Sequence, residues 1–200
     1  MRILIALSYA PYPVKRGTDR LVMNLIEGLS KNHEVALVTM TLEEREDTVL
    51  KRIENERITV RSILAPNRRS LLHRLYYKSR NKALSALRKI PEQTLYAAPP
   101  EYIRFVRETA RRQSVDLVIA FYWHLYELPS KLRGVPVAIA TQDVDFLVHP
   151  ERVKRARGRI GKILTSTEAG KRERVERLSY ESASIVLTVT DRDRDVLRGI

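Results

Sequence analysis

The sequence predicts an α/β fold, in which a doubly wound and mainly parallel sheet carries helices on both faces. Three observations lead to this class. Short apolar runs alternate with longer segments of helical periodicity. Several runs, such as VAIAT and SIVLTV, are almost continuously apolar, as in strands that helices cover on both sides. The 200 residues are 44% hydrophobic, which is enough for one sizeable core.

Six apolar runs are the expected strands, and we expect the first of them to lie in the centre of the sheet. The runs span residues 2–8, 34–39, 58–64, 116–122, 135–141 and 184–190. Right-handed crossovers are expected to join them. The carboxyl ends of parallel strands meet at one edge, so the loops after the strands are where a ligand is expected.

Helical patterns fill the segments between the runs. The first helix is predicted from an apolar stripe of Leu21, Val22, Leu25, Ile26 and Leu29. A capping-box pattern from Thr41 to Glu44 is expected to open the second. Further helices are expected near 70–90, 100–113 and 162–182, and a last one after Asp191, which is a good N-cap residue.

The formal net charge of +13 favours anionic partners: nucleic acid, phosphorylated small molecules or an acidic membrane face. The alternative is that arginine-rich helices only keep the protein in solution. The absence of cysteine excludes disulfides and cysteine-based metal sites, and no metal-binding motif occurs in the chain. No apolar run approaches the ~20 residues that span a bilayer, so a cytoplasmic protein is the simplest interpretation.

The loop between the first run and the first helix, SYAPYPVKRGTDR, has the position of an anion site. A strand, a turn and a helix amino terminus bring free backbone N–H groups to a phosphate. Neither GxGxxG nor GxxxxGK[ST] is present. Gly17, followed by Thr18, could still let a backbone amide approach a ligand closely. The alternative is that Gly17 completes a turn and that Thr18 or Asp19 caps the helix.

Three stretches carry a resemblance that covers essentially the whole chain. They are MRILIALSYAPYPVKRGTDRLVMNLIEGLSKNHEVALVT, ATQDVDFL and ERVERLSYESASIVLTVTDRDRDVL. In this order and spacing, they resemble the amino-terminal domain of retaining GT-B glycosyltransferases of the group 1, or family four, type. The matching residues are Pro11, Pro13, Gly17, Asn24, Leu25, Leu29, His33, Glu34, Val35, Glu176, Glu181, Ala183, Val189 and Asp193.

The resemblance implies that residues 1–200 form a single Rossmann-like, acceptor-side domain. A donor-binding carboxyl lobe is expected after Ile200 and is absent from this chain, so the chain alone is expected to be inactive. The complete enzyme is expected to move a hexose from a nucleoside diphosphate sugar to a hydroxyl of a sugar or lipid-linked acceptor, with retained configuration. The resemblance implies no metal and no cofactor beyond the donor substrate.

Two other classes of function stay open. One is a basic nucleic-acid-binding module, which the charge alone suggests; its basic residues are scattered and no recognition motif is present, so nucleic acid is the less favoured partner. The other is one lobe of a sugar-nucleotide epimerase on a related two-lobe fold.

The resemblance also assigns substrate contacts to the first loop. Gly17 and the amide of Thr18 are expected close to the donor diphosphate, in the cleft between the lobes. Arg16 stands where relatives often have another glycine. It either adds charge to the site or makes the backbone approach only partial.

The segment TQDVD follows the fifth run and supplies the next candidates. Asp143 could orient an acceptor hydroxyl or accept its proton, and Asp145 and Gln142 could bind substrate. Gln142 stands where relatives often have histidine, and it cannot titrate. The alternative is that Asp143 caps the following turn. Because both loops follow parallel strands, we expect Gly17 and Thr18 at the mouth of a cleft near Asp143.

The segment AFYWHLY follows the fourth run. Some relatives carry a catalytic histidine where this chain has Phe121, and His124, three residues later, could replace it or lie in a surface helix. Tyr122 and Trp123 could stack on an acceptor, or they could belong to the core.

Residues 68–89 form a basic and amphipathic stretch. Its cations are Arg68, Arg69, Arg74, Lys78, Arg80, Lys82, Arg88 and Lys89. Its apolar residues are Leu72, Leu75, Tyr76, Leu84 and Leu87. Such a stretch could lie on an anionic membrane, on the cytoplasmic face, as a peripheral anchor. The alternative is a helix packed on the lobe with a solvated basic face.

Overall fold

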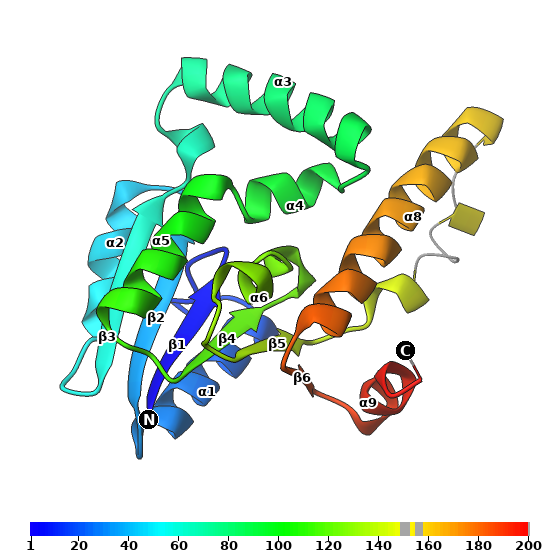
Figure 1. The fold of residues 1–200 in the computed structure, drawn as a ribbon. Helices are drawn as coiled ribbons and strands as arrows, with labels where there is room; N and C mark the ends of the chain where they lie inside the picture. The colour runs from blue at the N-terminus through cyan, green and yellow to red at the C-terminus, as the bar shows by residue number, and fades with distance from the viewer. Residues whose placement is uncertain (149–152, 155–157, 200) are drawn as a thin grey trace.

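The structure is a computed structural model, which describes residues 1–148, 153–154 and 158–199. Its centre is a six-stranded, all-parallel sheet with the order β3-β2-β1-β4-β5-β6 (Figure 1). Helices lie on both faces of this sheet. The predicted fold class, the six strands and the inner position of β1 are therefore confirmed.

The strands lie within two residues of the predicted runs at each end. Their bounds are β1 Arg2–Leu7, β2 Glu34–Thr41, β3 Ile58–Leu64, β4 Leu117–Phe121, β5 Val137–Thr141 and β6 Ile185–Thr188. β1 pairs with β2 on one side and with β4 on the other, so Ile5 lies opposite both Leu37 and Ile119. This double pairing explains why β1 is buried from Ile3 to Leu7.

The helices of the described residues connect these strands. Their bounds are α1 Gly17–Ser30, α2 Glu44–Leu50, α3 Leu71–Arg88, α4 Glu92–Ala97, α5 Pro100–Arg112, α6 Leu128–Lys131, α8 Gly158–Ser182 and α9 Asp191–Leu197. Single 3-10 turns stand at η1 Lys51–Ile53, η2 Pro66–Arg68, η3 Trp123–Leu125 and η4 Asp145–Leu147. The short α4 and α6 were not expected from periodicity, because one or two turns show too little of a repeat.

Two helix starts differ from the prediction. Thr41 is the last residue of β2 and no capping box forms there; instead the N–H of Leu42 donates to Glu46 Oε2 at 2.6 Å. The last helix is capped by Thr190, whose Oγ1 accepts from the N–H of Asp193 at 3.1 Å, so the cap lies one residue before Asp191. A cap is set by the residue at which the strand ends, and the sequence pattern alone does not give that position.

The core consists of two apolar layers, one on each face of the sheet. Side chains of β1 alternate between them, as the period of a strand requires. Ile5 joins α1 residues such as Val22 and Ile26 in one layer. Leu4 joins α5 residues, among them Tyr102, in the other.

Tyr102 ties α5 to the carboxyl end of the sheet. Its side chain is fully buried, and its hydroxyl lies 2.8 Å from the carbonyl oxygen of Leu7 and 2.9 Å from that of Val38. Burial raises the pKa of this phenol well above its ordinary value. The neutral hydroxyl therefore serves as a donor to the ends of β1 and β2.

The sheet has an apolar border at β6. Among the described residues, β6 pairs only with β5. Alternate side chains along it and just beyond it, Ile185, Leu187 and Val189, are exposed. One face of this edge strand is thus apolar and open.

We expect Tyr102→Phe to lower the free energy of unfolding by about 1–3 kcal/mol, because two buried carbonyl groups lose the one O–H donor that they share. Urea titration followed by circular dichroism measures the change. Tyr76→Phe is the matched control, since Tyr76 is 60% exposed. Equal stability of Tyr102→Phe and the control would contradict this assignment.

Candidate functional site

The candidate site lies at the carboxyl edge of the sheet, where β1 and β4 are neighbours. The chain leaves β1 toward β2 and reaches β4 by way of α5, so this pair is the point at which the strand order reverses. Ligands on open α/β sheets bind outside the strand ends at such a point. The loops that follow β1, β4 and β5 meet here.

Gln142, just after β5, joins these three loops. Its Oε1 accepts one hydrogen bond from Thr18 Oγ1 and another from the hydroxyl of Tyr122, each at 2.9 Å. Thr18 starts α1 after the β1 loop, and Tyr122 follows β4 directly. Thr18 thus lies beside the segment of Asp143 at the same edge of the sheet, as predicted. A cleft at that position stays a prediction.

Asp19 folds the first loop onto the start of α1. Its buried carboxylate accepts the N–H groups of Lys15 and Arg16, both at 2.9 Å. The capping function proposed for Thr18 or Asp19 thus falls to Asp19, while the hydroxyl of Thr18 is bound to Gln142. Arg16 is extended and exposed at the N-cap position. In the described part of the chain, no acceptor takes the N–H groups of Gly17 and Thr18.

Gly17 is not required by the backbone of this loop. Its φ is not in the left-handed region, and a Cβ built on it would meet no atom within 4 Å. The conformation and the packing of this domain would therefore accept a side chain there. Gly17 is exposed where the loop after β1 meets α1, so its backbone is accessible to a ligand.

Tyr122 holds a strained position beside these groups. Its φ of 73° lies in the left-handed region, which for such a residue costs on the order of 1–3 kcal/mol. Burial raises the pKa of Tyr122, and the hydroxyl is held on Gln142. Next to it, burial and Tyr122 itself raise the pKa of Tyr9, whose hydroxyl is buried without an acceptor in the described residues. A strained backbone and two interacting, half-buried phenol groups gather here, and strain of this kind is typical of functional sites.

Trp123 lies in the core and not in the site. It is 1% exposed, and its Nε1 donates to Asp145 Oδ2 at 3.0 Å. The expectation that Trp123 stacks on an acceptor is therefore corrected, because no face of the indole reaches solvent. The same bond occupies Asp145, so that residue orients the indole and the η4 turn in this structure.

His124 packs on Trp123, with ring centroids 4.0 Å apart. Burial lowers the pKa of its imidazole to about 4, and Nδ1 is buried without a partner in the described residues. A general base works best with a pKa near the ambient pH. In this structure His124 packs on Trp123 and its lowered pKa makes it a weak proton acceptor at neutral pH; a catalytic role of His124 stays a prediction.

Asp143 is the exposed carboxylate of the group. Its backbone carbonyl accepts a hydrogen bond from Thr141 Oγ1 at 2.7 Å. A capping function would require a hydrogen bond to its carboxylate, and in the described residues the carboxylate accepts none. The side chain is therefore accessible to a ligand.

Sequence reasoning missed a polar cluster behind this loop. Glu176 and Tyr180 of α8 are buried against Thr141. Burial raises the pKa of the Glu176 carboxyl to about 7. A charged residue in the buried stripe of a helix was the available signal.

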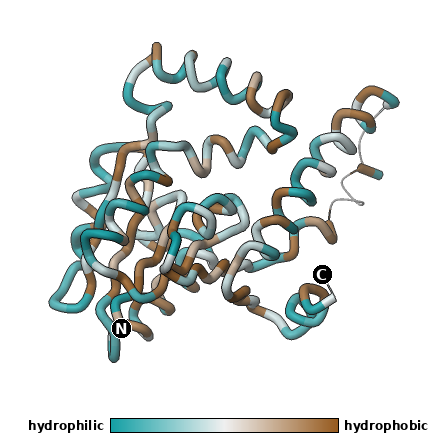
Figure 2. The backbone as a smooth tube through the Cα atoms, in the orientation of Figure 1, coloured by the Kyte–Doolittle hydropathy of each residue, from teal (hydrophilic) through white to brown (hydrophobic). Residues whose placement is uncertain are grey.

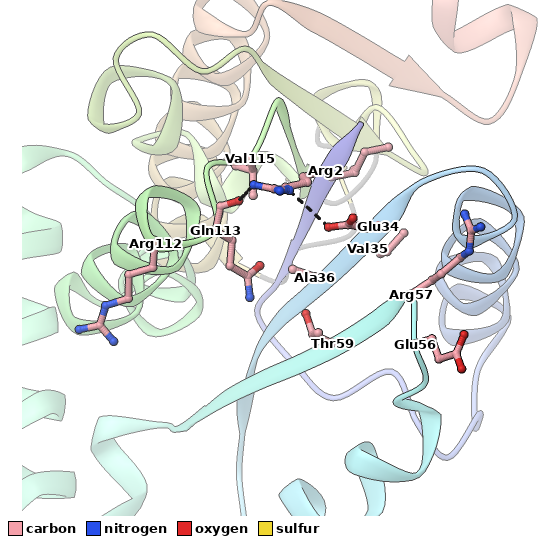
Figure 3. Close-up of a pocket in the computed structure, with 11 residues that line it drawn as sticks. Arg2, Glu34, Val35, Ala36, Glu56, Arg57, Thr59, Arg112, Gln113 and Val115 are labelled. Carbon is pink, nitrogen blue, oxygen red and sulfur yellow. Dashed lines mark hydrogen bonds and ion pairs between the residues drawn. The ribbon is translucent and has the colours of Figure 1, made fainter.

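The opposite edge of the sheet holds a hollow of about 280 Å³ (Figure 3). Arg2, Glu34 and Arg57 line it at the amino ends of β1 and β2, and Arg2 Nε lies 3.3 Å from Glu34 Oε2. This is an exposed ion pair far from the strand ends where ligands bind in such folds. Within residues 1–148, 153–154 and 158–199, no cluster of three or more His, Asp or Glu side chains could hold a metal ion.

Comparison with known families gives one match over most of the chain. The sequence model of the glycosyl transferase 4-like domain matches residues 16–200. A comparison with curated proteins found no match.

The buried imidazole makes a testable contribution to acid stability. Above about pH 6.5, His124 is neutral in both the folded and the unfolded chain; below it, the unfolded chain takes up a proton that the folded chain accepts only near pH 4. Wild type should therefore lose on the order of 2–3 kcal/mol relative to His124→Phe between pH 7 and pH 4. Denaturation at stepped pH measures this.

The difference between the two proteins is the informative quantity, because Glu176 titrates in the opposite direction: its raised pKa adds stability as the pH falls below 7. His73→Phe, at an exposed position on α3, controls for the loss of an imidazole. A pH-independent difference between wild type and His124→Phe would show that His124 is not held neutral by burial.

Proposed function

The chain belongs to the glycosyl transferase 4-like domain family, and from that premise we propose that it is the acceptor-side lobe of a retaining enzyme. The enzyme moves a sugar from a nucleoside diphosphate sugar to an acceptor hydroxyl. The observation that carries the proposal is the convergence of the loops after β1, β4 and β5 on Gln142. This convergence builds a polar site where such a sheet binds ligands.

The start of α1 suits the donor diphosphate. The N–H groups of Gly17 and Thr18 are without an acceptor, and the helix dipole favours an anion there. Arg16 adds an exposed guanidinium, which pairs well with phosphate oxygens. Because Gly17 carries no side chain, the phosphate can reach the backbone directly.

Asp143 and Gln142 suit the acceptor. The exposed carboxylate of Asp143 can orient a hydroxyl group and take up its proton as the glycosidic bond forms. Gln142 Oε1 is already occupied by two hydroxyl donors, so its amide –NH₂ is left to donate to a sugar oxygen. The Tyr122 ring, half-buried beside them, borders the same place.

An anionic membrane surface is the partner we propose for α3. Its inward stripe is Tyr77, Asn81 and Ser85, which are buried. Most of the leucines are exposed: Leu71, Leu72 and Leu87 are 70%, 78% and 80% exposed, whereas Leu84 is half-buried. This reverses the usual arrangement of a packed helix, whose apolar side faces the core.

The surroundings of α3 fit the same partner. The helix lies apart from the sheet, above α4, and apolar turns alternate with polar ones along it and along α8 (Figure 2). Residues 68–89 contain no Asp or Glu. A hollow of about 470 Å³ between α3 and α4 is lined by Arg68, Arg74 and Lys78 and by one carboxylate, Glu92; the cations are in excess, so a phosphate headgroup could bind there. In the described residues, no helix is long and apolar enough to cross a bilayer.

The site gives the first prediction for activity. In the full-length enzyme, Gly17→Val should lower turnover by at least about a hundredfold, because a branched side chain blocks approach to the Thr18 amide. Nucleoside diphosphate release from a panel of UDP- and GDP-sugars, with and without acceptor, measures it. Gly28→Val is the matched control, since Gly28 is exposed in α1 and meets no atom within 4 Å.

Both variants should unfold at the temperature of wild type, within a few degrees. If Gly17→Val kept the turnover of wild type, Gly17 would only complete the turn and would not contact a ligand. The anomeric configuration of the product, read by NMR, tests retention; an altered free nucleotide sugar without transfer would point instead to the epimerase alternative.

Vesicle binding tests the membrane proposal. The purified chain should bind vesicles that contain anionic lipid, and binding should fade as salt screens the attraction. Replacing Arg74, Lys78 and Lys82 by Glu should weaken binding at least about a hundredfold, since each cation contributes about 1 kcal/mol near an anionic surface. Co-sedimentation measures the bound fraction.

The control carries the same change of charge on α5, where Arg104, Arg111 and Arg112 are exposed and become Glu. It should bind as wild type does. Equal weakening by both triple variants, or binding that ignores salt, would overturn the assignment to α3.

A further inference from the structure

The loop that carries Gln142 and Asp143 is held from behind by one side chain of α8. Glu176 is 0% exposed. Its Oε1 accepts the N–H of Asp145 at 2.7 Å, and its Oε2 accepts the N–H of Phe146 at 2.8 Å. Both amides belong to the first residues of η4, which begins two residues after Asp143. The carboxylate thus clasps the backbone of the site loop with both of its oxygens.

A second route runs from the same carboxyl group to Asp143 itself. The Tyr180 hydroxyl lies 2.8 Å from Glu176 Oε1 and 3.1 Å from Thr141 Oγ1. Thr141 in turn donates to the backbone carbonyl of Asp143 at 2.7 Å. Four groups therefore connect the interior of α8 to the backbone of the exposed carboxylate.

The protons of this network depend on the charge state of Glu176, and only the protonated carboxyl gives each of its three contacts a donor. When the carboxyl is ionised, Tyr180 donates to it; when it is protonated, its O–H can donate to Tyr180, which then donates to Thr141. The pKa of Glu176 is raised to about 7, mainly by burial and to a smaller extent by the charge of Asp145, against the hydrogen bonds from Tyr180 and the two amides, which lower it. Charged and titratable groups on the same elements are His124 of η3, which interacts with Asp145 and with Arg172 of α8, and Arg177 of α8, whose guanidinium lies 4.6 Å from the centroid of the Phe146 ring.

We infer that Glu176 is a positioning residue of the proposed reaction, which sets the place of Gln142 and Asp143 through the backbone of their loop. This inference rests on the proposed function for the role of those two residues. A buried carboxylate is costly unless donors satisfy it, so a purely apolar contact would serve packing better. The two amides at two oxygens explain why a carboxylate stands here: glutamine offers one acceptor and directs an –NH₂ at the other amide.

The test uses the 200-residue chain and its only tryptophan. Trp123 donates to Asp145, whose own amide is held by Glu176, so its fluorescence reports on the clasp. In Glu176→Gln, hydrogen exchange at Asp145 and Phe146 should speed up at least about tenfold, as loss of a hydrogen bond to a charged group implies. The amides of β1 should keep their rates. Glu181→Gln, at an exposed position of the same helix, is the matched control.

A pH titration gives a second readout that a packing role would not produce. Wild-type Trp123 emission should show a transition near pH 7 that is absent from Glu176→Gln and retained in Glu181→Gln. Tyr180→Phe keeps the carboxyl but removes a hydrogen bond that lowers its pKa, so the transition should move to higher pH. This variant also decides the matter should Glu176→Gln fail to fold.

Exchange rates and titration of Glu176→Gln equal to those of the control would overturn the inference. In the full-length enzyme, Glu176→Gln should lower kcat at least about tenfold and leave KM for the nucleotide sugar within about twofold, because the donor end at Gly17 is untouched. An unchanged kcat would also overturn it. The two proposals can also fail separately. If exchange and fluorescence show the hydrogen bonds of Glu176 but the full-length protein transfers no sugar from any donor tested, the proposed function is refuted. Glu176 would then remain the residue that fixes the loop.

Discussion

The pairing of β1 with β4 in the middle of the sheet is the constraint on which the rest of this structure depends. The two strands are neighbours in register from Ile3 and Leu117 onward, yet the chain leaves them toward opposite halves of the sheet. Their loops, together with the loop after β5, therefore meet at the carboxyl edge, where Gln142 joins them. Tyr102 ties α5 to the same edge by donating to the carbonyl groups at the ends of β1 and β2.

The polar groups at this edge are held from two directions. From the front, Gln142 binds the hydroxyl groups of Thr18 and Tyr122, so α1, β4 and β5 share one junction. From behind, Glu176 of α8 binds the backbone just past Asp143. A residue whose own side chain stays exposed is thus fixed through its neighbours, which is how a flexible carboxylate gains a defined position.

The sequence was sufficient to predict the features that follow from hydrophobic periodicity or from the order of elements along the chain. Continuous apolar runs located all six strands, and parallel topology alone brought Thr18 to the edge that carries Asp143. It was insufficient where a few residues determine whether a side chain lies in the core or at the site. FYWHL reads equally well as a site or as core, and the turn at Tyr122, with its positive φ, sends Trp123 inward. The sequence marked Glu176 only as a match to the family and as a charged residue in a buried helical stripe; its partners, backbone amides 31 and 30 residues away, could not be read from the pattern.

The open apolar border at β6 has a consequence for how the separate chain behaves in solution. An unpaired strand edge with exposed Ile185 and Leu187 is a template on which another strand can add. The force that opposes such growth is the mutual repulsion of molecules that each carry a net charge of +13. Added electrolyte shortens the range of this repulsion and leaves the apolar contact intact. Ionic strength therefore governs whether this chain aggregates, and a buffer of low ionic strength keeps its molecules apart.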